Sequence, residues 1–136
     1  MERVGLIQMT SGADPEQNID FVAAQLPGLV VQGAQWVVLP ENALVFGSRA
    51  DYHRHAYPLG DGPLFAAMAA LARQHAIWIV VGSMPVRRAE GVSTTCVVIN
   101  PLGEPVAYYD KLHMFDVDVA DGHQHYRESE TFIPGN

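Results

Sequence analysis

Residues 35–42 read QWVVLPEN, and this stretch decides how the rest of the chain is interpreted. The run from Trp36 to Leu39 is short, unbroken and apolar, which is typical of a strand covered on both faces. Pro40 ends this strand, because proline has no N–H to donate to a neighbouring strand. Glu41 therefore follows the carboxyl end of a predicted strand, where open α/β sheets bind their ligands. Charged residues at strand ends are also common on ordinary surfaces, so Glu41 could equally be a solvated side chain.

The segments around this strand predict an α/β fold. Residues 4–8 and 77–81 have the composition of buried strands, and the second is expected to end at residues 82–85, which contain a glycine and a proline. Residues 93–99 and 105–109 indicate two more strands, joined by a turn-rich link short enough for a hairpin. Alternating strands and helices followed by a hairpin predict a mixed sheet flanked by helices.

Two helices and one irregular segment complete the pattern. Asp14 and Pro15 are a helix N-cap and first helical residue, and Pro27 is expected to kink or break that helix, because it lacks an N–H. The Asp-Gly-Pro sequence at residues 61–63 predicts the start of a second helix. Residues 43–59 show no clear period and should form a loop or short helix over the strand ends.

Composition limits the classes of function. The chain has 136 residues, enough for one domain, and its net charge of −7 argues against a nucleic-acid or membrane partner and favours a small molecule or a protein. Cys96 is the only cysteine, which excludes an intrachain disulfide or a cysteine-based zinc cage. The N-terminus lacks signal-peptide features, and no apolar run approaches the roughly 20 residues that span a bilayer. We therefore expect a soluble, cytoplasmic protein.

A second charged residue, Lys111, follows a predicted strand as Glu41 does. If the fold brings both strand ends to one crevice, an ammonium would lie beside a carboxylate. Such a pair can stabilise negative charge on a carbonyl oxygen and move protons. The alternative is a surface salt bridge, or two charges that do not interact.

Two other features of the sequence contain residue types found in metal or catalytic sites. A polar cluster near the C-terminus contains Asp116, Asp118, Asp121, His123 and His125. Its first two aspartates imitate a calcium loop, but Asp121 stands where the turn glycine should be, and Arg127 occupies the position of the closing glutamate. We therefore predict neither a metal nor a cofactor, and interpret the cluster as a polar loop that shapes a pocket. Cys96 lies within a predicted strand and is expected to be a small buried core residue.

Four segments, taken together, resemble the carbon-nitrogen hydrolase (nitrilase) superfamily. Residues 4–9, 33–42, 82–83 and 109–117 match its first half in order, and the resemblance covers essentially the whole chain. The sequence YDKLHMFDV at 109–117 is most similar to the Nit branch, whose members are amidases for omega-amides or deaminated glutathione. The resemblance implies an αββα sandwich of the nitrilase type, of which residues 1–136 would be a single, truncated N-terminal portion.

The resemblance also implies roles for individual residues. In a Glu-Lys-Cys triad, Glu41 would be the general base and Lys111 the cation that stabilises the oxyanion. Glu128 best matches a second glutamate that holds the substrate and the lysine, and Glu130 is a weaker match. The nucleophilic cysteine would lie beyond Asn136, so the chain alone is expected to be inactive towards its small carboxamide substrate.

Two further functions stay open at this point. A half-length chain of this fold should expose unpaired strand edges, so it could be a non-catalytic assembly module that recruits another copy or a complementing chain. Either way we expect a homo-oligomer. A doubly wound nucleotide-binding domain shares the alternating order of elements, but residues 60–63 lack the spacing of its glycine fingerprint.

Overall fold

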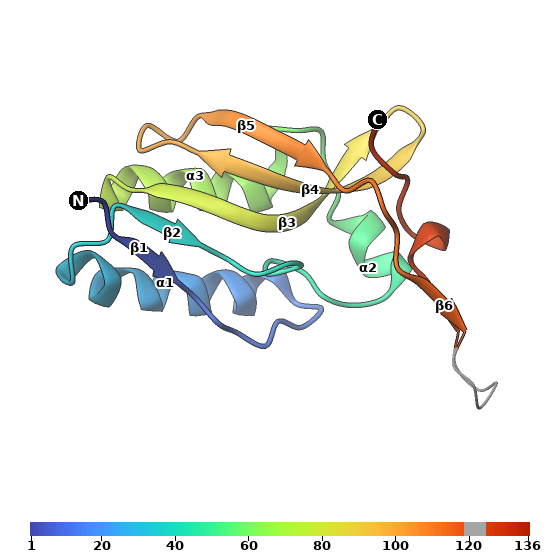
Figure 1. Cartoon of the computed structure of the whole chain (residues 1–136), viewed down its shortest axis with the longest axis horizontal. Coiled ribbons are helices and arrows are strands. Elements are labelled where there is room, and N and C mark those ends of the chain that lie inside the picture. The colour runs from blue at the N-terminus through green and yellow to red at the C-terminus, as the bar shows by residue number, and fades with distance from the viewer. Residues whose placement is uncertain (119–124) are drawn as a thin grey trace.

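Five strands form one mixed sheet in a computed structural model of the chain (Figure 1). The structure describes residues 1–118 and 125–136. The sheet has the strand order of the sequence: β1 (Val4–Leu6), β2 (Trp36–Val38), β3 (Trp78–Arg88), β4 (Gly91–Ile99) and β5 (Pro105–Asp110). The first three strands are parallel, and the pairs β3–β4 and β4–β5 are antiparallel. The predicted mixed α/β sheet is therefore confirmed.

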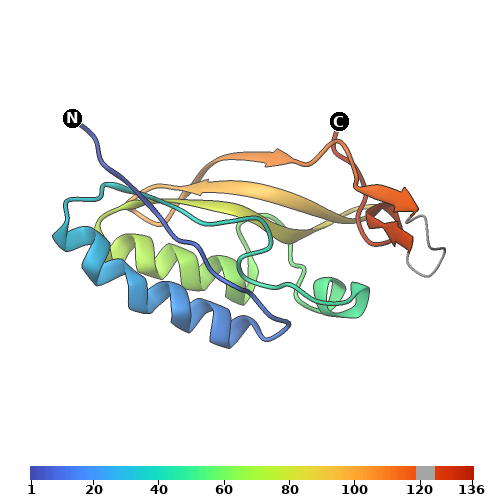
Figure 2. The ribbon, with the colours of Figure 1, turned by 60° about the horizontal axis from the view of Figure 1, so that its bottom comes forward.

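The long helices lie on one face of this sheet. Figure 2 shows α1 (Pro15–Val31) and α3 (Gly62–His75) together beneath the strands. Val37 and Ile79 point toward this side and are fully buried with the rest of the core. Burying one such aliphatic side chain contributes about 1.5–3 kcal/mol. A third, short helix, α2 (Arg49–Arg54), lies beyond the ends of the parallel strands, as expected for residues 43–59.

The opposite face of the sheet is open. Its side chains are apolar, yet Leu6 is 74% exposed and Trp36 and Trp78 are only partly buried. The two indole rings stack on each other, with centroids 4.6 Å apart. One helix layer and one sheet layer of an αββα sandwich are therefore present in the described residues. None of their helices combines the length and the apolar character needed to cross a membrane.

The first helix differs from its prediction. The Asp14 carboxylate accepts a hydrogen bond from the Glu16 N–H, so the predicted N-cap is confirmed. The helix nevertheless continues through Pro27, and the predicted break there is wrong. Pro27 lies on the exposed side of the last turns, where water can hydrate the carbonyl of Ala23 that the missing N–H would have bonded.

The third strand also runs further than predicted. It continues through Pro85 to Arg88, with a shift of register between Val81 and Met84. β2 ends opposite Val80, so the second half of β3, which contains Pro85, is not paired with β2. Proline is tolerated at such edges and bulges, because no ladder bond requires its N–H.

The last part of the chain contains short elements that the sequence pattern does not indicate. The strands β6 (Asp116–Asp118) and β7 (His125–Arg127) pair antiparallel in a small separate sheet, followed by the 3-10 helix η1 (Glu128–Glu130). Strands of three residues are too short to show a reliable period of two in the sequence. After β7, the helix η1 turns the chain back towards the end of β5.

Candidate active site

Glu41 follows β2 in a turn that packs tightly on β3. The Leu39 N–H donates to the Val80 carbonyl at 2.9 Å, which continues the ladder one residue past the strand. A Cβ added to Gly82 would overlap the carbonyl oxygens of Leu39 and Pro40. Only glycine allows the two backbones to approach so closely. The absence of a side chain at Gly82 therefore determines where Glu41 lies.

The residue after Glu41 has an unusual backbone conformation. Asn42 has φ of 53°, in the left-handed region that few residues other than glycine and asparagine adopt. Its N–H donates to Ser83 Oγ at 2.9 Å. The turn that carries Glu41 is therefore fixed from β3 on both sides, by close contact at Gly82 and by this hydrogen bond at Ser83.

Lys111 reaches Glu41 from the end of β5. Its N–H donates to the Thr94 carbonyl at 3.0 Å, and its carbonyl accepts from the Gly135 N–H at 2.9 Å. Its ammonium donates to Glu41 Oε1 at 3.0 Å, across 70 positions of sequence. The expected convergence of the two strand ends is therefore present in the structure.

Glu128 completes a carboxylate–ammonium–carboxylate cluster. The Lys111 Nζ lies 3.0 Å from Glu128 Oε1 and donates a hydrogen bond to Oε2 at 3.3 Å. Oε1 is buried and, within the described residues, is in ion-pair contact but has no aligned donor. Glu130, the alternative match, is exposed, and Glu128 is the residue that contacts Lys111.

The segment that carries Glu128 is held from two sides. The Glu128 N–H donates to the Phe115 carbonyl at 3.1 Å, and the Ser129 hydroxyl donates to Asp116 at 2.7 Å. From α2, Arg49 donates to the Glu130 carbonyl at 3.0 Å, and the ring of Tyr52 packs on that of Phe132. The position of the Glu128 carboxylate therefore depends on several fixed neighbours.

The charge state of Lys111 follows from this surrounding. Partial burial acts to lower the pKa of its ammonium, but the hydrogen bonds and charges of Glu41 and Glu128 together outweigh it, and the pKa lies above its ordinary value. The side chain is therefore a cation at neutral pH. A fixed cation of this kind can stabilise negative charge that develops on a carbonyl oxygen.

The raised pKa predicts how pH affects the fold. Lys111 contributes stability that is fully present below the ordinary pKa of 10.5 and is lost as the pH rises through the higher folded-state value. Lys111 is the only lysine in the chain, so the ¹³Cε NMR shift of labelled lysine titrates this side chain alone. We expect a midpoint above 10.5 in the wild type and a lower one in Glu41→Gln. A wild-type midpoint at or below 10.5 would contradict the ion-pair geometry.

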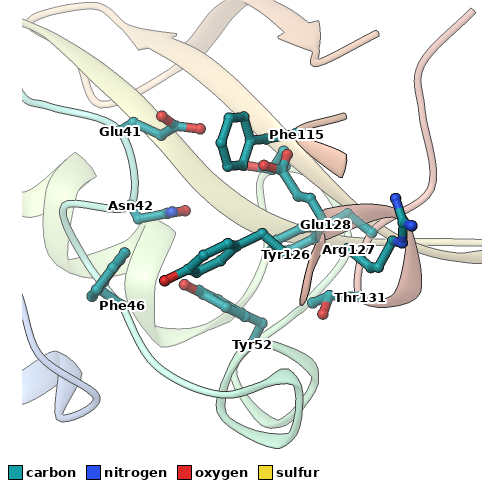
Figure 3. A pocket seen from close by; sticks show the side chains of 11 residues that line it. Glu41, Asn42, Phe46, Tyr52, Phe115, Tyr126, Arg127, Glu128 and Thr131 are labelled. Atoms are coloured by element: carbon teal, nitrogen blue, oxygen red, sulfur yellow. The ribbon is translucent and has the colours of Figure 1, made fainter. Parts of the chain in front are cut away.

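A cavity of about 260 Å³ opens beside Glu41 and Glu128 (Figure 3). Its walls include the aromatic residues Phe46, Tyr52, Phe115, Tyr126 and Phe132. Burial, and then the negative charges of Glu128 and Glu41, raise the pKa of Tyr52, so its hydroxyl stays protonated. Figure 3 shows the Arg127 guanidinium directed away from the other labelled side chains. The cavity therefore offers neutral hydrogen-bonding groups and ring faces next to the charged cluster.

Cys96 was expected to be a buried core residue, and this expectation is wrong. It is half-buried on the open face of the sheet and lines a second cavity, of about 210 Å³, together with Glu41 and Lys111. Full burial would need cover on both faces of the strand, but no layer of the described residues covers this one. Burial raises the pKa of the Cys96 thiol, which keeps it protonated and makes it a poor nucleophile.

The aspartates near the C-terminus have a structural environment of their own. The hydrogen bond from the Ser129 hydroxyl, followed by that from its N–H, lowers the pKa of Asp116. The parts of the chain that the structure describes contain no group of three or more side chains placed to hold a metal ion. Two of the candidate metal ligands, Asp121 and His123, lie outside the described residues.

Comparison with known proteins decides the family. The model of the carbon-nitrogen hydrolase family matches residues 3–136. The chain belongs to this family. The chain is 42% identical over 135 residues to a deaminated glutathione amidase of Yersinia enterocolitica, and 31% identical over 136 residues to the omega-amidase NIT2 of Homo sapiens. These matches cover 97% and 98% of the chain but 47% and 48% of the relatives, so it spans about half the length of the curated relatives it matches.

Solved structures give the same fold. The NitFhit protein of C. elegans matches the chain with a TM-score of 0.84 at 26% identity, covering 98% of the chain and 33% of that protein. An amidase from Nesterenkonia matches with a TM-score of 0.81 at 22% identity, covering 100% of the chain and 50% of that protein. The expected nitrilase fold and the family resemblance are therefore confirmed.

Three features of the site were not predicted from the sequence. The left-handed backbone of Asn42 had a weak signal, because asparagine tolerates positive φ, but nothing in the sequence marked a turn there. The tight contact at Gly82 depends on a neighbouring strand 40 or so positions away. The aromatic wall comes from segments without a clear period, and only the fold brings them together.

Proposed function

We propose that residues 1–136 form the N-terminal part of an amidase domain that hydrolyses a small carboxamide to an acid and ammonia. The observation that carries this proposal is the Lys111 ammonium held between Glu41 and Glu128 beside a cavity. In this site Glu41 is the general base and Lys111 stabilises the oxyanion. Glu128 holds the lysine and helps to hold the substrate.

The reaction has two steps. A cysteine outside residues 1–136 loses its proton to Glu41, and the thiolate attacks the carbonyl carbon of the amide. The proton passes to the leaving nitrogen, ammonia departs and a thioester remains. Glu41 then takes a proton from water, and the hydroxide attacks the thioester to release the acid and restore the thiol. Lys111 faces the carbonyl oxygen whenever it becomes negative.

The names of the relatives support a substrate class. One acts on deaminated glutathione and another on omega-amides, according to their names, and both match along nearly the whole of this chain. We propose a substrate of the same kind, a small carboxamide that is an omega-amide or resembles deaminated glutathione. The active form is proposed to be a cytoplasmic homo-oligomer that requires no metal or cofactor.

The proposal is tested by supplying the missing half. Residues 1–136 alone are expected to release no ammonia from a simple omega-amide. A fusion to the second half of the Yersinia enterocolitica relative is expected to restore turnover. Glu41→Gln should abolish the restored activity, and Cys96→Ser should retain it. Hydrolysis by the isolated chain that needs Glu41 and survives Cys96→Ser would overturn the proposal, because it would show a route without cysteine.

A second function is supported by the open face of the sheet. The outer edges of β1 and β5 have no neighbouring strand among the described residues, and the apolar side chains on the open face between them are only partly buried. Such a surface suits a non-catalytic module that pairs with another copy or a complementing chain. Light scattering on the isolated chain separates the cases, since a compact, well-behaved monomer would count against this function.

A further inference from the structure

The strand that immediately precedes Lys111 is poorly packed. β5 lies at the edge of the sheet, and nearly all its residues are exposed. Tyr108 and Tyr109, just before the end of the strand, are 59% and 57% exposed. Edge segments with few buried contacts open easily, so hydrogen bonds within β5 alone would hold Lys111 weakly.

Asp110 anchors the end of this strand to its neighbours. Its Oδ1 accepts hydrogen bonds from Thr95 Oγ1 at 2.7 Å on β4 and from Arg88 Nη2 at 2.8 Å on β3. The Asp110 side chain is only 21% exposed and that of Arg88 26%. Ser93 extends the network, because its hydroxyl lies 2.8 Å from Thr95 Oγ1 and accepts from Arg88 Nε at 3.3 Å. The two bonds that the Asp110 carboxylate accepts are short and charge-assisted, and such bonds are stronger than those between neutral groups.

The geometry links this anchor to Lys111. Successive side chains of a strand point to opposite faces, so Asp110 is held on the side of the buried Thr95 while Lys111 projects to the open face. Gly135 packs directly against the backbone of Asp110, because a Cβ at position 135 would lie 2.6 Å from the Asp110 carbonyl oxygen. The backbone at the end of β5, from which Lys111 projects, is therefore held in place by contacts on the opposite face of the sheet from the Lys111 side chain.

We propose that Asp110, held by Arg88 and Thr95, is a positioning residue that keeps the Lys111 ammonium between Glu41 and Glu128. Only the catalytic meaning of this placement rests on the proposed function. Placement of this accuracy matters for catalysis, since a displacement of about 1 Å can cost about a hundredfold in rate.

The test uses the fact that Lys111 is the only lysine. Trace acylation with an amine-selective reagent, followed by peptide mapping, measures the reactivity of this one side chain apart from the N-terminal amine. Acylation requires the unprotonated amine, so the ion pairs slow it. We expect Asp110→Asn to accelerate acylation several-fold, and about tenfold if the amine loses one pKa unit.

A second variant separates position from charge. Asp110→Asn removes a negative charge and Arg88→Gln removes a positive one, so electrostatics alone would change the rate of acylation in opposite directions. Loss of the anchor predicts acceleration in both variants. Acceleration in only one, opposite changes or no change would overturn the proposal. Asp61→Asn is the matched control, because the Asp61 side chain makes no capping bond in α3, and it should leave the rate unchanged.

Two measurements keep the outcome interpretable. If Asp110→Asn does not fold, Thr95→Val removes one bond to Asp110 and carries the same expectation of faster acylation. Glu41→Gln tests the ion pair itself. An unchanged rate in Glu41→Gln would count against the proposed function, whereas a faster rate there with unchanged Asp110 and Arg88 variants would count against the positioning role alone.

Discussion

Replacing Lys111 by methionine is expected to lower kcat for ammonia release about a thousandfold in the fusion that restores the second half of the domain. Methionine keeps much of the length of lysine but removes the charge. The oxyanion would lose its cation, and the carboxylates of Glu41 and Glu128 would lose the counter-charge 3.0 Å from each. Removal of one stabilising group from an oxyanion site costs about 10²–10³ in rate.

The matched control for this variant is Arg54→Met. It removes one positive charge from a side chain that is 68% exposed and pairs only loosely with Asp51, at 3.9 Å. Exposed pairs of this kind contribute little, so we expect turnover within about twofold of the parent. If Lys111→Met folded and kept more than about a tenth of the activity, its contact with Glu41 would be a surface salt bridge with no role in the reaction.

Replacing Gly82 by alanine is expected to destabilise the fold by about 2–3 kcal/mol or more. The added Cβ would overlap the carbonyl oxygens of Leu39 and Pro40, which are backbone atoms that cannot rotate away. Either β3 or the turn that carries Glu41 must move. Urea unfolding measures the loss of stability, and the ¹³Cε titration of Lys111 should show a lower midpoint, because Glu41 is displaced from it.

Gly28→Ala is the control for this substitution. A Cβ at Gly28, in the exposed part of α1, would meet nothing within 4 Å. Alanine is favoured over glycine in helices by about 0.8–1.0 kcal/mol, so the same chemical change should here increase stability. Equal stability of Gly82→Ala and the wild type would mean that the two backbones do not approach as closely in solution.

The features that the sequence predicted well depend on near neighbours. The apolar run before Pro40 predicted the end of β2 to within one residue, and Asp14 with Pro15 predicted the start of α1. The pairing of Glu41 with Lys111 could be anticipated because both follow strands of one sheet. These inferences need only local conformation and the rule that strand ends share an edge.

The failures concern residues whose environment is set by distant parts of the chain. Pro85 lies inside β3 because β2 has already ended, which no local pattern reveals. Cys96 lies in the middle of a predicted strand, which suggested a core position, yet one face of that strand is open. The Asp110 network joins three strands, and its members look like ordinary polar residues in the sequence.

The stacked pair on the open face has an optical consequence. Trp36 and Trp78 are the only tryptophans in the chain, so its tryptophan emission originates from one place on the uncovered sheet. Whatever docks there must exclude water from both indoles at once. The two tryptophans therefore act as an intrinsic fluorescent probe of that surface, and a shift of their emission spectrum on mixing with a partner would report docking without an added label.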